Sequence, residues 1–318
     1  MTDGTEIVWS RGGERPSTAP DLYRYVPDAA SPEIVFQNPN RDSTIDLLTV
    51  HGGRYAFAES NRRLYGENGF RLWLLPTIGA TPVLIDQSDW KDGEPTPPLP
   101  FMALNDERLV WTTVHHASGR LQFQLLSYDI ATATTDVLVS SDARNTEYWF
   151  PTLADDDQHV VFATVEHDEP EVAFHVKLLE LDGSARVRNL DHLGHATWPA
   201  ITGSTAIWKH VDRNVLDAGV LERASIDQPG LTESPLAELS TRANDPSAGD
   251  RFVAAWRDDD TDLVVYDLRS NRPVTIEAVP AGKQEGLERP VVHGNLLVYV
   301  RGFFDAQPLQ LCWVRLPS

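Results

Sequence analysis

Four of the ten histidines in the sequence lie a few residues after a short apolar run: His115, His116, His167 and His210. Histidine suits general acid–base chemistry because its ordinary pKa lies near neutrality. If the protein is an enzyme, we therefore predict that one of these histidines acts as the base. Tyr148, which lies in a connecting segment, is a further candidate catalytic residue.

Cationic and aromatic residues occupy comparable positions along the chain. Arginine pairs with carboxylates and phosphates through two hydrogen bonds, and aromatic rings stack on flat or apolar ligand faces. We therefore predict an anionic or sugar-like small molecule as the ligand, although Trp256 has packing between strands as its alternative role. The predicted ligand-binding residues are Arg11, Arg62, Trp149, Trp198, Lys209, Asn244, Trp256, Arg257, Arg289 and Arg301.

The apolar runs that precede these residues recur along the whole chain. Their last residues are 48, 54, 51, 46, 46 and 45 positions apart, a regularity that indicates one repeated unit. Short β-branched and aromatic runs separated by Gly, Pro, Asn and Asp are typical of antiparallel strands. The seven runs are Glu6-Ile7-Val8-Trp9, Arg54-Tyr55-Ala56-Phe57, Arg108-Leu109-Val110-Trp111, His159-Val160-Val161-Phe162, Thr205-Ala206-Ile207-Trp208, Arg251-Phe252-Val253-Ala254 and Leu296-Leu297-Val298-Tyr299.

Each complete unit reads as four strands, of which the recurring run is the second. A strand that begins with proline precedes the run, as at Pro151–Ala154, and a third strand follows, as at Leu121–Tyr128. Four-stranded antiparallel units repeated radially form a β-propeller. We predict an all-β propeller with a single domain over residues 1–318 and seven blades; six blades with an accessory hairpin are the alternative. In such a fold the candidate residues share one face, at the mouth of the central channel.

The segment Ala154-Asp155-Asp156-Asp157-Gln158-His159-Val160-Val161-Phe162 resembles the aspartate-rich turn and following strand of TolB-like propellers. The resemblance extends to WD-repeat propellers at the level of architecture, although the Trp-Asp dipeptide is missing. The candidate residue types are also similar to those of propeller-fold polysaccharide lyases. That resemblance implies that Arg257 or Arg301 neutralises a uronate carboxylate while a histidine removes the neighbouring proton, with Tyr148 as the acid.

We predict no cofactor and no metal. Because His116, His167 and His210 follow the runs of successive units, a divalent metal near them is the minority alternative. None of these histidines has the spacing of a recognised zinc site. The single cysteine, Cys312, excludes an intrachain disulfide and a cluster of thiolate ligands.

The net charge of −20 indicates which partners the surface repels. Nucleic acid and anionic membranes are excluded because their phosphates carry the same sign of charge. The N-terminal residues lack the basic start and apolar stretch of a secretory signal, so a cytoplasmic protein is predicted. Two functions stay open: binding, with or without catalysis, of the small molecule described above, and a non-catalytic scaffold that binds protein partners.

Overall fold

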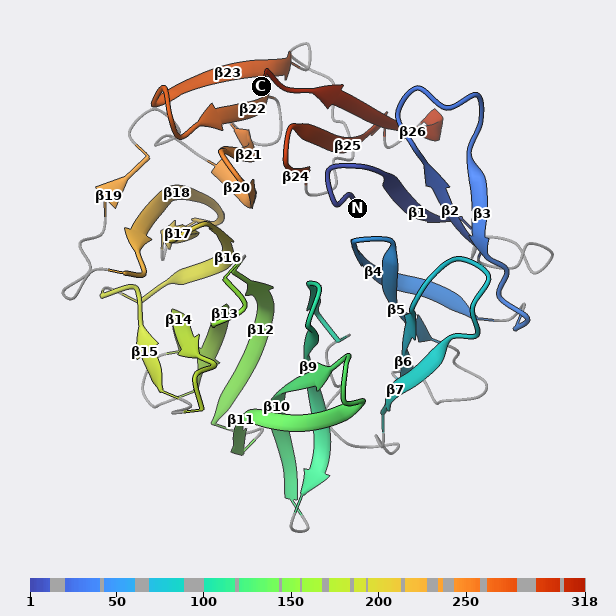
Figure 1. The fold of residues 1–318 in the computed structure, drawn as a ribbon. Coiled ribbons are helices and arrows are strands. Elements are labelled where there is room, and N and C mark those ends of the chain that lie inside the picture. The colour runs from blue at the N-terminus through green and yellow to red at the C-terminus, as the bar shows by residue number, and fades with distance from the viewer. Residues whose placement is uncertain are drawn as a thin grey trace. The chain divides into compact units, whose positions relative to one another are not determined.

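The computed structural model describes most of the chain as β-strands connected by turns. It describes residues 1–11, 21–40, 43–60, 69–88, 100–117, 120–142, 145–154, 156–167, 172–183, 186–192, 194–212, 215–227, 234–236, 243–257, 262–278, 290–303 and 306–317. Within these ranges there is no α-helix. The strands form seven antiparallel sheets, five of four strands and two of three, so the fold is a seven-bladed β-propeller (Figure 1). The prediction of seven blades is confirmed. We number the blades in chain order.

The chain divides into two compact units, and the division falls within blade 4. Unit 1 comprises Met1, residues 3–153 and residues 165–171, and so holds blades 1 to 3 and the first strand of blade 4. Blade 1 contains β1 (Ile7–Arg11), β2 (Asp21–Tyr25) and β3 (Glu33–Phe36). Blade 2 contains β4 (Thr44–His51), β5 (Arg54–Ser60), β6 (Phe70–Leu75) and β7 (Val83–Gln87). Blade 3 contains β8 (Met102–Leu104), β9 (Arg108–Ala117), β10 (Arg120–Asp129) and β11 (Thr134–Asp142).

Unit 2 comprises Thr2, residues 154–164 and residues 172–318, with blades 5 to 7 and most of blade 4. Blade 4 contains β12 (Thr146–Leu153), β13 (His159–Glu166), β14 (Ala173–Glu180) and β15 (Val187–Asn189). Blade 5 contains β16 (Ala196–Thr202), β17 (Thr205–Asp212), β18 (Val215–Ser225) and β19 (Ser234–Pro235). Blade 6 contains β20 (Ala243–Gly249), β21 (Phe252–Arg257), β22 (Asp262–Asp267) and β23 (Arg272–Ala278). Blade 7 contains β24 (Val291–His293), β25 (Leu296–Phe303) and β26 (Ala306–Arg315).

Six of the seven recurring runs lie in the second strands of blades 2 to 7, as their spacing predicted, and the first run lies in β1, the first strand of the three-stranded blade 1. These strands are buried on both faces: in β5, five consecutive residues are buried. Side chains of a strand point alternately to the two faces of its sheet, so burial on both faces means that each face is covered by packed side chains. The outermost strands are more exposed, as Val137 of β11 (54%) and Val274 of β23 (59%) illustrate. This gradient explains why the second strands carry the clearest sequence signal.

In blades 4, 5 and 6 the first strands begin before the prolines that were predicted to start them, whereas β24 of blade 7 begins directly after Pro290. In β16 the pairing with β17 shifts register between Thr197 and Ala200, and in β20 a shift lies between Asn244 and Ser247. Pro199 and Pro246 lie within these irregularities. Proline lacks the N–H that a regular ladder needs and is tolerated at a bulge. The strand therefore continues through the proline instead of beginning at it.

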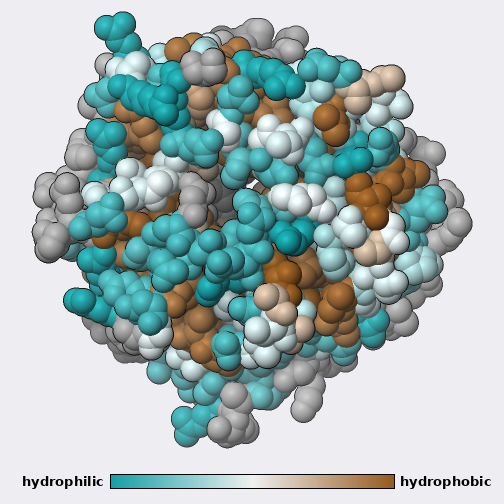
Figure 2. All heavy atoms as spheres, in the orientation of Figure 1, coloured by the Kyte–Doolittle hydropathy of each residue, from teal (hydrophilic) through white to brown (hydrophobic). Residues whose placement is uncertain are grey.

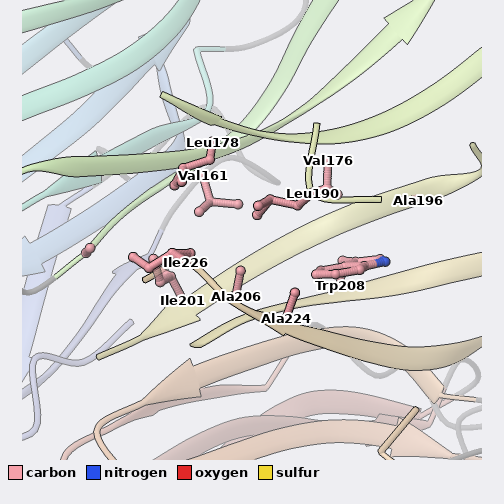
Figure 3. Close-up of a cluster of buried hydrophobic side chains, with 11 residues drawn as sticks. Val161, Val176, Leu178, Leu190, Ala196, Ile201, Ala206, Trp208, Ala224 and Ile226 are labelled. Atoms are coloured by element: carbon pink, nitrogen blue, oxygen red, sulfur yellow. The ribbon is translucent and has the colours of Figure 1, made fainter. Parts of the chain in front are cut away.

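The hydrophobic core consists of separate clusters between neighbouring blades. In unit 2, Val161, Val176, Leu178 and Leu190 of blade 4 face Ile201, Ala206, Ala224 and Ile226 of blade 5, with Trp208 at one end of the cluster (Figure 3). In unit 1, one cluster lies between blades 1 and 2 and another between blades 2 and 3. Because each of these clusters is formed by the facing sides of two neighbouring blades, the repeated unit gains its core by stacking on its neighbours.

Polar pairs join the same blade faces. Tyr55 of blade 2 donates a hydrogen bond from its hydroxyl to the Glu6 carboxylate before blade 1, at 2.9 Å. Burial is the main cause that raises the pKa of Glu6, and burial followed by the Glu6 hydrogen bond raises the pKa of Tyr55. Arg24 of β2 completes the group with an ion pair to Glu6 at 3.3 Å. The polar side chains of Glu6, Arg24 and Tyr55 are thus paired with one another between blades 1 and 2.

Candidate functional site

The predicted site residues fall into three groups according to what the structure describes. Arg62 and Arg289 lie outside the described residues, and the strands that contain Arg11, Asn244, Arg257 and Arg301 are described without those side chains. The remaining candidates are divided between the units. Unit 1 holds His115, His116, Tyr148, Trp149 and His167, and unit 2 holds Trp198, Lys209, His210 and Trp256.

His115 is held by a carboxylate of the preceding blade. Asp86 of β7 accepts a hydrogen bond from Trp111 Nε1 at 2.8 Å. His115 Nε2 lies 3.0 Å from Oδ1 of the same carboxylate. Trp111 and His115 both belong to β9, so this carboxylate joins the outer strand of blade 2 to the second strand of blade 3. The Asp86 side chain is 11% exposed. We call this arrangement, in which one carboxylate bonds an indole N–H and a histidine, a carboxylate brace.

A second carboxylate brace contains two of the predicted residues, Trp149 and His167. Glu147 of β12 accepts a hydrogen bond from Trp149 Nε1 at 2.9 Å, and His167 Nε2 lies 2.9 Å from Glu147 Oε1. The backbone N–H of His167 also donates to the carbonyl of Asn145, which holds the segment after β13 beside the start of β12. The two side chains of the ion pair are partly exposed, at 35% for His167 and 24% for Glu147.

A third and looser brace lies in blade 5. Trp208 Nε1 donates to Glu222 Oε2 at 3.0 Å, and His210 Nδ1 lies 3.8 Å from the same oxygen. Trp208 and Glu222 are directly opposite on β17 and β18, so the strand register places them together. The neighbouring Lys209 is buried. The cation predicted to bind ligand is therefore enclosed by the protein.

The other described candidates are buried or partly buried. Tyr148 is buried, and its pKa is raised mainly by burial, against a hydrogen bond with Ser141 that lowers it. A raised pKa makes the hydroxyl a poorer proton donor than an ordinary tyrosine. Trp256 packs in the core cluster between blades 6 and 7, 6.4 Å from the Tyr299 ring, which is the packing role given as its alternative. His116 and Trp198 are partly buried.

Sequence reasoning missed the carboxylates Asp86 and Glu222 and the aromatic residues Phe101 and Phe150. Asp86 lies within β7, directly after the apolar residues of that strand, and Glu222 faces a tryptophan only through the register of two strands. Phe101 and Phe150 contact each other, with ring centroids 4.3 Å apart, and both contact Trp149. Their position next to a proline was the available signal.

Among the residues that the structure describes, no group of three or more His, Cys, Asp or Glu side chains is arranged to hold a metal ion. His116, His167 and His210 are among the described residues and form no such group. In the same part of the chain, no helix has the length and apolar character needed to cross a membrane.

The fold is similar to propellers in several solved structures. A prolyl endopeptidase, studied for the role of inter-domain dynamics in catalysis and specificity, matches with a TM-score of 0.68 at 12% identity, covering 99% of this chain and 46% of that one. The propeller domain of the trilobed protease from Pyrococcus furiosus matches with a TM-score of 0.65 at 10% identity, covering 100% of this chain and 93% of that one. TolB from Acinetobacter baumannii matches with a TM-score of 0.54 at 12% identity, covering 87% and 66% of the two chains.

These similarities establish the architecture of the chain, which is a TolB-like seven-bladed propeller. The chain spans about half the length of the prolyl endopeptidase that it matches. No family model matches the sequence, and no curated protein does so either.

Proposed function

We propose that this chain is a non-catalytic propeller that binds a basic segment of a polypeptide. The observation that carries the proposal is the carboxylate brace. Asp86, Glu147 and Glu222 each accept an indole N–H and lie beside a histidine that was predicted to act as a base. A carboxylate beside a histidine can also orient a catalytic base, but here each carboxylate is bonded to the indole N–H of a tryptophan, so we interpret the pairs as structural contacts.

Histidine–carboxylate pairing also occurs away from the predicted site residues. His159 Nδ1 lies 2.6 Å from Asp156 Oδ2 in the turn before β13, and His175 Nδ1 lies 2.9 Å from Asp191 Oδ2. Asp191 is buried and also accepts backbone N–H groups from Val176 and Gly194. Since the same pairing recurs in turns and links, we infer that it stabilises the architecture and does not mark a catalytic centre.

The electrostatics favour a cationic partner. The net charge of −20 produces a field that attracts basic segments and repels anions. In each brace the carboxylate places a negative charge beside the histidine. An anionic ligand that contacted this histidine would be repelled by that charge. Figure 2 shows a largely hydrophilic face with hydrophobic residues exposed between the polar ones, which offers both charge and apolar contacts to a peptide. The two protease neighbours indicate that propellers of this architecture occur in proteins that act on polypeptides.

The proposal is tested by measuring the affinity of two peptides of equal length by isothermal titration calorimetry. One peptide alternates lysine or arginine with apolar residues, and the other carries glutamate at every basic position. We expect saturable binding of the basic peptide only. Equal binding of both peptides, or binding of the acidic peptide alone, would contradict the proposal.

The anionic or carbohydrate-like ligand stays a prediction from the sequence, together with the lyase chemistry that depends on it. Its arginines Arg257 and Arg301 have side chains outside the described part of the chain. Thermal shift with uronates, sugar phosphates and divalent metals tests this function separately. A rise in melting temperature with uronates, accompanied by formation of an unsaturated product, would replace the proposed function with the lyase.

A further inference from the structure

Three aromatic rings of unit 1 form a partly exposed cluster, which we call the Phe101–Trp149–Phe150 cluster. Phe101 precedes β8, and its carbonyl accepts the backbone N–H of Thr112, so it lies beside the second strand of blade 3. Trp149 and Phe150 belong to β12. The ring centroids are 4.3 to 5.7 Å apart and the planes are inclined by 36° to 56°. None of the three residues is fully buried, unlike Phe57, Trp111 and Trp208 of the second strands.

The backbone at Phe150 is strained. Its φ of 49° lies in the left-handed region, which a bulky residue seldom adopts. The next residue is Pro151, and a residue before proline favours extended conformations. Trp198, which precedes Pro199 in blade 5, has a φ of 53°. Strained backbone of this kind persists where the surroundings impose it, and it often aims a side chain at a functional site.

The cluster carries a negative charge at its edge. Glu147 Oε2 accepts the hydrogen bond of Trp149 Nε1, which fixes the orientation of the indole ring relative to the carboxylate. Aromatic faces are electronegative, and a carboxylate beside them strengthens the attraction for a cation. The rings contact one another directly, so a cation would lie on their exposed faces, and their mutual inclination leaves no flat platform for a sugar ring.

We propose that the Phe101–Trp149–Phe150 cluster, together with Glu147, binds the ammonium or guanidinium group of a lysine or arginine side chain. The inference rests on the proposed function, because it assigns a position in unit 1 to one basic side chain of the polypeptide. The methylene groups of that side chain contact the rings, and its charged group lies near Glu147. Glu147 thus has two roles, bracing His167 and attracting the ligand.

The test uses n-butylammonium as a mimic of the lysine side chain and 1-butanol as its neutral counterpart. The indole N–H resonances of the protein labelled with ¹⁵N are followed during titration, and the spectrum of a Trp149→Phe variant identifies the Trp149 signal. We expect a saturable shift of this signal with n-butylammonium and none with 1-butanol. No saturable shift, or equal shifts with both compounds, would overturn the proposal.

Two substitutions separate attraction from folding. Glu147→Gln preserves the size of the side chain and removes its charge, and we expect it to weaken n-butylammonium binding about 3- to 30-fold. Asp86→Asn is the matched control, since Asp86 makes the same two kinds of contact but its tryptophan, Trp111, is buried in the core. Unchanged affinity in Glu147→Gln, or an equal loss in Asp86→Asn, would contradict the assignment, and the other indole signals report whether each variant is folded.

The outcomes distinguish this inference from the proposed function. If the basic peptide binds while the Trp149 signal stays unchanged, the polypeptide binds elsewhere and the cluster is not its site. If n-butylammonium binds saturably while the basic peptide does not bind, the cluster is a cation site and the polypeptide proposal is wrong.

Discussion

Replacing Asp86 with alanine tests whether a carboxylate brace stabilises the contact between neighbouring blades. The substitution removes the acceptor of the Trp111 indole N–H and the partner of His115. It also removes the side-chain acceptor of the Gln87 backbone N–H. Trp111 is 1% exposed, so water cannot readily replace the lost partner. We therefore expect Asp86→Ala to lower the free energy of unfolding.

The size of the loss follows from the two contacts. A buried donor left without its partner costs about 1–3 kcal/mol. The pair with His115 is 22% exposed on the histidine side, so solvent screens it and its loss adds about 0–1 kcal/mol. The sum is about 1–4 kcal/mol, which corresponds to a decrease in Tm of roughly 2–6 °C for a chain of this length. Asp86→Asn keeps one acceptor oxygen and should cost about 1 kcal/mol.

Urea unfolding followed by tryptophan fluorescence and circular dichroism measures these changes. Trp111→Phe, which removes the indole N–H, completes a double-mutant cycle with Asp86→Ala. Because the two residues share one hydrogen bond, the loss in the double variant should be smaller than the sum of the single losses by about 1–2 kcal/mol. Additive losses, or an Asp86→Ala variant as stable as the parent protein, would refute the structural role of the brace.

Two further predictions concern blades 6 and 7, and both use urea unfolding. Gly249→Ala should lower the free energy of unfolding by about 3 kcal/mol, because the new Cβ would lie 2.6 Å from the carbonyl oxygen of Val292. Gly79→Ala is the control: its φ is 79° but the space around it is open, so the loss should be about 1 kcal/mol. Similar losses would refute this reading of the close approach. Hydrogen bonding from Arg251 lowers the pKa of Asp267 in the folded protein, so the stabilising contribution of Asp267 is lost as the pH falls below about 4. Asp267→Asn removes this contribution, and the free energy of unfolding of the variant should therefore depend less on pH in acid. The same dependence of stability on acidic pH in the variant and the parent protein would contradict this role of Asp267.

The fold could be predicted from sequence because its strongest signal comes from strands buried on both faces. Residues such as Phe57, Trp111 and Trp208 end runs that recur at nearly constant spacing, and all three are fully buried. The starts of the first strands were less accurate. Proline suggested a boundary at Pro199, but the strand accommodates it at a register shift.

The candidate site could be predicted only in part. Strand periodicity located the histidines near the ends of the second strands, yet their partners depend on packing between segments far apart in the chain. Asp86 and His115 are 29 positions apart and belong to different blades. Phe101 and Phe150 looked like ordinary apolar strand residues, because inclination and partial exposure of rings have no signature in a single sequence.

The central claim is that the protein binds a basic polypeptide segment through electrostatic and aromatic contacts. Fluorescence anisotropy of a labelled lysine- and arginine-rich peptide, measured at increasing salt concentrations, tests this claim most directly. We expect saturable binding that weakens steadily as salt screens the acidic surface. Binding that is independent of salt, or absent at low salt, would contradict it.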